Sequence, residues 1–233
     1  GTLDFSPPLA DGSAYSVSVL TQPTNPSQTC DITNASGDLS GSSITSVQVS
    51  CTTNSYTVGG TVSGLEGTGL VLQNNGGDDL TITAGDTFTF DTALLDGSAY
   101  EVTVLSQPTG PNQTCTVGNA GGTLAGGEVT NVEVTCTTET YTVGVEVSGL
   151  DGTGLVLQNN GGDDLPVDTD GTLDFSTPLA DGSAYSVSVL TQPDSQVCTV
   201  IDGADTLAGA DVTVTVTCEA LYSIRGEVTG LAG

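Results

Sequence analysis

The sequence predicts an all-β fold, built as a tandem array of antiparallel β-sandwich repeats of about 80 to 85 residues, each with one disulfide. Three observations predict it. Apolar and polar residues alternate along many short segments, as at Val212, Val214 and Val216 with threonines between them, which is the period of a half-buried strand. Long motifs recur along the chain. The six cysteines fall into pairs at the same place in each recurrence.

The repeat boundaries follow from a motif that begins with tyrosine. Tyr56 opens YTVGGTVSGLEGTGLVLQNNGGDDL, Tyr141 opens YTVGVEVSGLDGTGLVLQNNGGDDL, and Tyr222 opens the shorter YSIRGEVTGLAG. The motif DGSAY recurs at Asp11, Asp96 and Asp181 and indicates a turn before a strand. The predicted domains are the C-terminal part of a repeat at 1–55, complete repeats at 56–140 and 141–221, and the first strand of a following repeat at 222–233.

Turn-forming residues divide the repeat at 56–140 into about seven short strands. We expect them near residues 56–63, 69–74, 80–83, 87–93, 99–107, 113–118 and 129–137. This pattern is typical of an immunoglobulin-like sandwich, although the cysteines are closer together than in antibody domains and the chain has no tryptophan. The topology therefore stays open. Alternation places three residues of each repeat in its core: Val132, Val134 and Cys136 in one, Val47, Val49 and Cys51 in another.

The cysteines indicate disulfides rather than a metal site. The expected pairs are Cys30 with Cys51, Cys115 with Cys136, and Cys198 with Cys218, each about 20 residues apart. A zinc site would need closer cysteine pairs or histidines, and the chain has no histidine. Each bridge should tie the last two strands of a repeat together and stabilise it by about 3 kcal/mol. Disulfides in turn predict an oxidising compartment, outside the cell or on its surface.

The charge is strongly one-sided, with 28 acidic residues against Arg225 and a net charge of −27. Nucleic acid is excluded as a partner because a polyanion would be repelled. Membrane insertion is excluded because no segment approaches the roughly 18 consecutive apolar residues that a spanning helix needs. The acidity favours solubility and keeps exposed strand edges apart.

The motifs YTVGGTVSGL and GLVLQNNGGDDL, the DGSAY stretch and the paired cysteines resemble the tandem immunoglobulin-like repeats of large bacterial secreted and surface proteins. The resemblance covers the whole chain. It implies a stalk, an adhesin or a cell-surface polymer, and it brings no catalytic residues. The absence of histidine removes the common nucleophilic triads, so we expect no enzyme activity.

The loop NNGGDD, present in both complete repeats, has two interpretations. Adjacent aspartates beside glycines can supply oxygen ligands for Ca²⁺, which makes Asp78, Asp79, Asp163 and Asp164 candidate ligands. Asn-Gly is equally the strongest signal for a tight hairpin turn. No other cofactor is expected. Asn34 and Asn112 each begin a possible N-glycosylation motif.

The frame of the repeats bears on assembly. Residues 1–23 and 171–193 differ only at Pro7 and Thr177, so residue 1 corresponds to a position well inside a repeat. Either the chain is part of a longer array, or copies join head to tail, with the last strand of one completing the first repeat of the next. Contacts of that kind generate filaments because they do not close.

We therefore expect an extracellular structural protein whose tandem repeats form a filament or stalk at a bacterial surface. Its partners would be copies of itself or neighbouring repeats of the same chain. The alternative is an adhesin, or a repeat array that binds Ca²⁺ or another ligand through its acidic loops. The isolated cation Arg225, where the complete repeats have Gly59 and Gly144, indicates drift at an exposed site or an ion pair between subunits.

Overall fold

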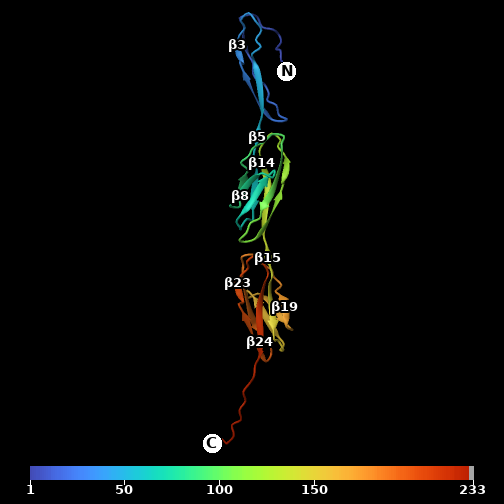
Figure 1. Ribbon diagram of the computed structural model, residues 1–233, viewed down its shortest axis with the longest axis vertical. Helices are drawn as coiled ribbons and strands as arrows, with labels where there is room; N and C mark the ends of the chain where they lie inside the picture. The colour runs from blue at the N-terminus through green and yellow to red at the C-terminus, as the bar shows by residue number, and fades with distance from the viewer. Residues whose placement is uncertain (231–233) are drawn as a thin grey trace. The chain divides into compact units, whose positions relative to one another are not determined.

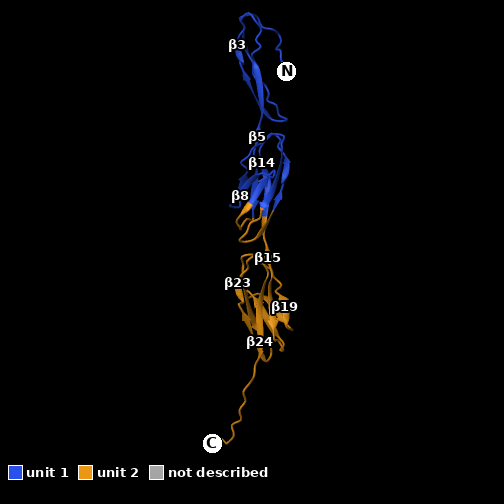
Figure 2. Cartoon of the chain, in the orientation of Figure 1, with its two compact units in different colours: residues 1–63, 71–105, 116–135 blue, residues 64–70, 106–115, 136–233 orange. Residues whose placement is uncertain are grey.

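The computed structural model describes residues 1–230 and confirms the all-β fold with three disulfides. The last residues of the predicted segment 222–233 lie outside the described part. The chain forms two compact units: residues 1–63, 71–105 and 116–135, and residues 64–70, 106–115 and 136–233 (Figure 1, Figure 2). Their boundary passes through the repeat at 56–140. Residues 1–230 contain no helix long and apolar enough to cross a membrane.

The N-terminal 55 residues form two separate ladders. β1 (Ala14–Ser16) pairs with β3 (Ser36–Asp38), and β2 (Gln28–Thr33) pairs with β4 (Gln48–Thr53), both antiparallel. Each is a two-stranded sheet. Two-stranded ladders bury little apolar surface, so this region depends on its disulfide and its turns.

The repeat at 56–140 is a sandwich of two four-stranded sheets, with strand orders β13-β11-β7-β8 and β12-β14-β6-β9. Its strands are β5 (Ser55–Tyr56), β6 (Val58–Ser63), β7 (Leu70–Asn74), β8 (Asp78–Ile82), β9 (Thr87–Thr89), β10 (Leu94–Leu95), β11 (Ala99–Ser106), β12 (Gln113–Gly118), β13 (Gly121–Thr123) and β14 (Val129–Thr138). The longer strands lie within a few residues of the expected ones. β10 and β13 are additional short strands: β13 is an edge strand beside β11, and β10 pairs with β5 in a separate two-stranded sheet.

The repeat at 141–221 has the same plan, with sheets ordered β19-β16-β24-β22 and β18-β17-β21-β23. Its strands are β15 (Thr140–Tyr141), β16 (Val143–Ser148), β17 (Leu155–Asn159), β18 (Asp163–Val167), β19 (Gly171–Asp174), β20 (Leu179–Ala180), β21 (Ala184–Thr191), β22 (Gln196–Ile201), β23 (Ala204–Thr206) and β24 (Val212–Ala220). Pro166 lies in the edge strand β18, where its missing amide removes no bond from a central ladder.

The first long strand of each complete repeat runs parallel to the last. β16 pairs with β24 from Val143 opposite Val212 to Ser148 opposite Thr217, and β6 pairs with β14 in the same sense. A parallel pair needs a long connection, and here the rest of the repeat supplies it. β16 also pairs antiparallel with β19, so it lies inside its sheet with neighbours on both sides.

The core of the last repeat consists mainly of valine and leucine. Along β16 the alternate residues Val143, Val145 and Val147 are buried, and they pack with Leu157 and Val216 from facing and adjacent strands. One aromatic ring, Phe175, is also fully enclosed. The small core agrees with the composition, and it leaves the disulfide a large share of the stability.

Each disulfide links directly opposite residues of the last two long strands. Cys198 faces Cys218 between β22 and β24, and Cys30 faces Cys51 between β2 and β4. Cys115 and Cys136 form the third bridge. These bridges join strands of one sheet, unlike the bridge between sheets in antibody domains.

The predicted core of the N-terminal region is wrong in detail. Val49 is 49% exposed and Cys51 is exposed, whereas Val47 is half-buried. Apolar and polar residues alternate along β4 as they do on a strand with one buried face. However, β4 pairs only with β2, and among residues 1–230 no second sheet covers its apolar face. A strand pattern specifies which face is apolar, and a facing layer must be present to bury it.

Replacing Cys198 and Cys218 together by serine should lower the free energy of unfolding of the last repeat by about 3 kcal/mol, because the unfolded chain regains the entropy of an open loop. Thermal unfolding under oxidising conditions measures this. Thr199→Ser, an exposed change on the same strand, is the control and should stay within about 0.5 kcal/mol of the parent chain. Equal stability of the two variants would contradict a stabilising role for the bridge.

Candidate functional site at the repeat junctions

A short ladder begins each complete repeat at its junction with the preceding one. β5 pairs with β10 through Tyr56 and Leu94, and β15 pairs with β20 through Tyr141 and Leu179. The first tyrosine of each repeat motif is thus paired with the strand just before the DGSAY turn. This brings the DGSAY turn close to the tip loop of the preceding repeat, by which we mean residues 23–28 and 108–113.

The DGSAY aspartate of each complete repeat accepts two backbone hydrogen bonds, one from each side of the junction. One carboxylate oxygen of Asp96 accepts the Ser27 amide at 2.5 Å, and the other accepts the Gly126 amide at 2.7 Å. Asp181 accepts the amides of Asn112 and Gly209 at 2.6 and 2.7 Å in the same way. Each junction lies within one compact unit.

Further contacts run the other way across each junction. The Asp96 amide donates to the Asn54 carbonyl, and the Asp181 amide donates to the Glu139 carbonyl, both at 2.8 Å. The Tyr56 hydroxyl lies 3.1 Å from the Ser27 hydroxyl. The Asn112 side-chain amide correspondingly donates to the Tyr141 hydroxyl at 3.4 Å. The aspartate therefore both donates and accepts at the joint.

These backbone amides lower the pKa of both carboxyl groups. The largest cause is the Ser27 amide for Asp96 and the Asn112 amide for Asp181, and the second is the glycine amide of the same repeat. Partial desolvation acts in the opposite direction but is outweighed. Both aspartates are largely covered, with exposures of 7% and 9%. The junction therefore favours the charged carboxylate.

The N-terminal region contains the same turn with half of these contacts. One carboxylate oxygen of Asp11 accepts the Gly41 amide at 2.7 Å, which corresponds to the Gly126 and Gly209 bonds. No tip-loop amide among residues 1–230 reaches its other oxygen, and Asp11 is exposed. In the last repeat, Ser195 lies in a third tip loop. The Ser195 carbonyl accepts a hydrogen bond from the Leu221 amide at 2.8 Å.

The NNGGDD loops are hairpin turns whose carboxylates are already engaged. Asp79 and Asp164 each accept a glutamine side chain from the paired strand at 2.6 Å. Asp78 accepts the Thr92 amide, and Asp163 accepts Ser176 and Thr177. Burial opposes ionisation of Asp163, but these hydrogen bonds outweigh it and lower its pKa.

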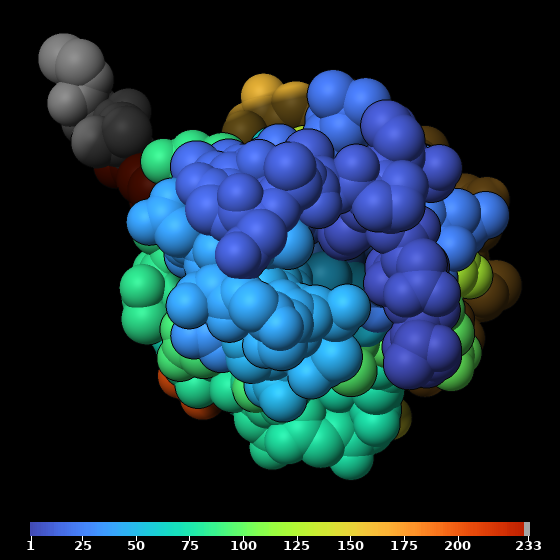
Figure 3. Space-filling model, turned by 90° about the horizontal axis from the view of Figure 1, so that it is seen from above, coloured from blue at the N-terminus to red at the C-terminus, as the bar shows by residue number. Residues whose placement is uncertain are grey.

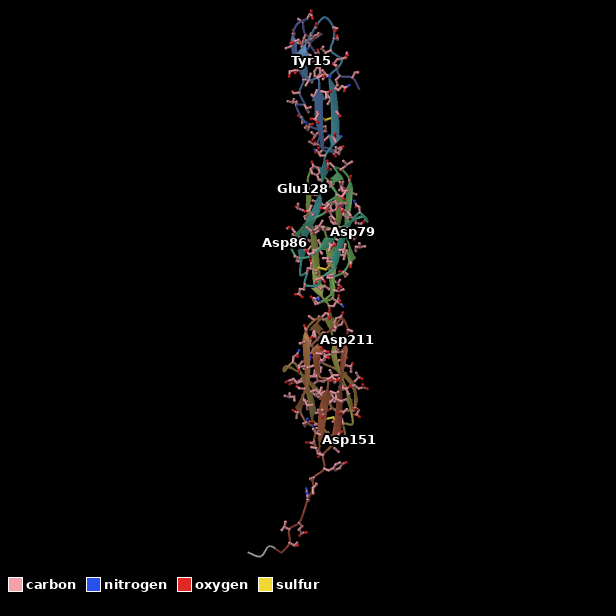
Figure 4. The ribbon with its side chains drawn as sticks, turned by 60° about the vertical axis from the view of Figure 1, so that its left-hand side comes forward. Tyr15, Asp79, Asp86, Glu128, Asp151 and Asp211 are labelled. Atoms are coloured by element: carbon pink, nitrogen blue, oxygen red, sulfur yellow. A yellow bond between two sulfur atoms is a disulfide. The ribbon has the colours of Figure 1, made fainter. Side chains whose placement is uncertain are left out.

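The two aspartates of each loop point to opposite faces of the hairpin, as successive residues of a strand do. Within the described part of the chain, no group of three or more acidic or cysteine side chains is placed to hold a metal ion. Figure 4 labels three acidic residues of the repeat at 56–140, Asp79, Asp86 and Glu128, and all three are exposed.

The two possible glycosylation residues lie in different surroundings. Asn34 is exposed and its side-chain amide donates to the Ser46 carbonyl at 2.8 Å. Asn112 is half-buried in the second junction, where both its backbone and its side chain are hydrogen-bonded. A sugar on Asn112 would have to displace the contact with Tyr141.

The role of the DGSAY aspartates was not foreseen from the sequence, which indicated only a turn that bonds its own backbone. The available signal was the joint recurrence of three elements in each repeat: a proline-initiated tip loop ending in glutamine, the opening tyrosine and the DGSAY turn. Gln113, the last residue of one tip loop, is buried, and its side-chain oxygen accepts the amides of Glu66 and Gly67 at 2.8 Å. Spacing alone did not show that these elements meet.

The sequence matches no protein-family model and no curated protein. Among solved structures, the Bacillus anthracis TIE protein is similar over 75% of this chain, with 11% identity and a TM-score of 0.48. The minor pilin GBS52 of Streptococcus agalactiae and a C-terminal fragment of the pilus adhesin SpaC from Lactobacillus rhamnosus GG are each 13% identical, with TM-scores of 0.31 and 0.36.

The coverage differs between these structures. The chain spans 37% of the TIE protein, so it corresponds to about a third of that molecule. It covers 99% of GBS52 and 100% of the SpaC fragment, over 74% and 73% of its own length. Function is therefore inferred from the geometry of the chain itself.

Acid should loosen both junctions. Because the folded-state pKa of Asp96 and Asp181 is lowered, their contribution is fully present above the unfolded value of about 3.9 and is lost as the pH falls through the lowered pKa. Protection factors of the Ser27 and Asn112 amides, measured by hydrogen exchange, should therefore fall as the pH is lowered below about 4.

Asp181→Asn should lower the protection of the Asn112 amide at neutral pH and remove most of its acid dependence, because the neutral side chain accepts more weakly. Asp79→Asn is the matched control, since that exposed carboxylate bonds only the Gln73 side chain. Unchanged protection in Asp181→Asn would show that the carboxylate does not hold the junction.

Proposed function

We propose that the chain is an extracellular structural protein whose tandem sandwiches form a stalk or filament at a bacterial surface. Copies join head to tail, with residues 222–233 of one copy completing the sheet at residues 1–55 of the next. The observation that carries this proposal is a pair of complementary exposed apolar segments, one at each end, whose counterparts inside the chain are buried against each other.

The acceptor segment is seen by comparing identical sequence in two settings. Phe175 is 3% exposed in the complete repeat, whereas Phe5, in the matching stretch GTLDFS, is 70% exposed. Val216 is fully buried on β24, whereas Val49, at the same distance before its cysteine on β4, is 49% exposed. The N-terminal region thus has the residues of a sandwich core without the strand that covers them. Figure 3 looks onto this end, where a hollow separates the first residues (dark blue) from a later, lighter-blue segment.

The donor segment has the converse property. Ile224 and Val228 are 103% and 75% exposed, and no described strand pairs with them. Their counterparts Val143 and Val147 on β16 are 0% and 2% exposed. An apolar strand of this kind gains free energy by adding to an open sheet edge, where backbone hydrogen bonds supply affinity and alternate side chains supply specificity.

Charge and redox chemistry support the same assignment. One disulfide per repeat suits an oxidising exterior. A net charge of −27 makes lateral association between copies unfavourable, so growth is confined to the ends, where apolar segments are exposed. Contacts between unlike ends repeat without closing, which produces a linear polymer.

The purified chain should form linear polymers that shorten to monomers when residues 222–233 are deleted. Sedimentation velocity and electron microscopy of both forms measure this. The deletion removes no residue of either complete sandwich, so thermal unfolding of those repeats should be unchanged. Monodisperse monomers of the undeleted chain at high concentration would contradict assembly by this route.

A matched control separates strand addition from loss of chain length. Ile224→Asp with Val228→Asp keeps every residue in place but charges the face that would enter the core. It should abolish assembly as completely as the deletion, because a charge buried without a partner is costly. Exposed Thr229→Ser should leave assembly unchanged.

A further inference from the structure

The chain contains an internal template for the contact between copies. In the last repeat, β16 lies between β19 and β24, with Gly144 opposite Asp174 and Val145 opposite Leu173 on the β19 side. On the β24 side, Val145 faces Val214 and Val147 faces Val216. Because residues 1–5 repeat residues 171–175 without a change, they can pair with a β16-like strand in the same register.

The donor segment aligns with β16 without gaps from Tyr222. Ile224 and Val228 take the places of the inward-facing Val143 and Val147, and Glu227 takes the place of Glu146. Two positions depart: Gly226 stands where β16 has the buried Val145, as Gly60 does in the repeat at 56–140, and Arg225 stands where β16 has Gly144. Gly144 is covered by Asp174: a Cβ there would lie 2.5 Å from an Asp174 carboxylate oxygen, the movable end of a side chain, and 3.2 Å from the Leu173 carbonyl oxygen. At the equivalent Gly59 a Cβ would overlap the Phe88 carbonyl oxygen, so a side chain at this position requires the neighbouring strand to shift.

At position 225 a basic side chain can pair with an acidic residue of the second copy. Asp174 has no basic residue near it, since the chain has only one cation. In the next copy, Asp4 is the counterpart of Asp174 and is exposed. An arginine placed opposite it forms a cross-strand ion pair on the solvent face of the sheet, and like charges at the same place would repel.

We propose that residues 222–230 of a second copy insert between residues 1–4 and β4 in the register that sets Arg225 opposite Asp4. The same placement brings the Ser195 tip loop to Asp11, whose second carboxylate oxygen then accepts the Ser195 amide. The inference rests on the proposed head-to-tail function and adds to it the register and the residues that select it.

The Asp11 contact follows from the two junctions inside the chain. In both, the tip-loop residue lies 29 residues before the tyrosine that opens the next repeat, and its amide donates to the DGSAY aspartate of that repeat. Ser195 and Tyr222 are the corresponding residues at the donor end, and Tyr222 is 91% exposed. Asp11, with its bond to Gly41 already formed, has the acceptor position at the other end.

The contact would complete one sheet and leave the other short. Residues 153–170, which contain β17 and β18, have no counterpart in residues 1–55 or 222–233. The inserted strand therefore supplies the central position of the sheet that carries the disulfide, next to β4. Specificity for one register matters more here than in a complete repeat, because fewer neighbouring strands constrain the insertion.

Charge reversal tests the register. Arg225→Asp alone and Asp4→Arg alone should each raise the concentration needed for half-maximal assembly by roughly fivefold or more, and the double variant should restore it toward the parent value. Arg225→Gly, which copies Gly144, is the control and should assemble with a smaller loss, since the internal strands pair with glycine there. Both residues are exposed, so the complete repeats should unfold at the parent temperature.

Cysteine crosslinking tests the same register directly. Glu227 corresponds to Glu146 and Thr2 to Thr172, which are opposite each other in the internal template. A mixture of Glu227→Cys and Thr2→Cys chains should give a covalent dimer on mild oxidation, and a chain with both changes should give a ladder of multimers. Glu227→Cys mixed with Asp4→Cys, two positions out of register, is the matched control and should crosslink weakly.

The outcomes separate the two proposals. Polymers that form without the 227–2 crosslink, and whose assembly ignores charge reversal, would overturn this register and leave head-to-tail assembly standing. A chain that remains monomeric and gives no crosslink overturns both. Asp11→Ala should weaken assembly and keep the 227–2 crosslink; unchanged assembly in Asp11→Ala would overturn the contact between Asp11 and Ser195.

Discussion

The sandwich repeats depend on a strand that must be enclosed on both sides. β16 lies inside its sheet between β19 and β24, and its alternate valines form the centre of the valine and leucine core. It is also the first long strand of its repeat, directly after the junction with the repeat before it. Because this strand runs parallel to the last one, the sheet is finished only after nearly the whole repeat has been assembled. The two-stranded sheets at residues 1–55 show the same requirement from the other side, since Phe5 and Val49 stay exposed where no such strand is present among the described residues.

The junctions explain how a strongly acidic chain can place carboxylates between packed repeats. Asp96 and Asp181 are largely covered, yet each accepts two backbone amides, one from either side of its joint. Backbone amides stabilise a carboxylate by hydrogen bonding without a basic side chain. The contact can therefore form in a chain that has only one arginine and no lysine. The same bonds give the tip-loop backbone amides an acceptor that water would otherwise have to supply. In both complete repeats the DGSAY aspartate therefore has a structural role at the junction.

Much of the fold could be predicted because it is encoded locally. Strand alternation, the turn residues and the paired cysteines located the long strands and the disulfides to within a few residues. The parallel pairing of β16 with β24 could not be predicted, since alternation is the same in parallel and antiparallel partners. The exposure of Val49 was missed because burial depends on a facing layer and not on the strand's own pattern. The junction was missed for a related reason: Asp96 and Ser27 are distant in sequence, and their contact depends on how consecutive repeats follow one another.

An exposed apolar segment in a chain that also has an open sheet edge is normally a hazard, because any similar edge can pair with it. The charge distribution limits that hazard. With a net charge of −27, two copies repel in most orientations, and an unselected pairing would set acidic residues against each other. Arg225 is the only basic side chain, and it lies in the segment whose counterpart β16 pairs with the strand that contains Asp174. Repulsion nearly everywhere, with attraction at one position of one strand, favours a single partner surface and a single register over the many that hydrophobicity alone would allow.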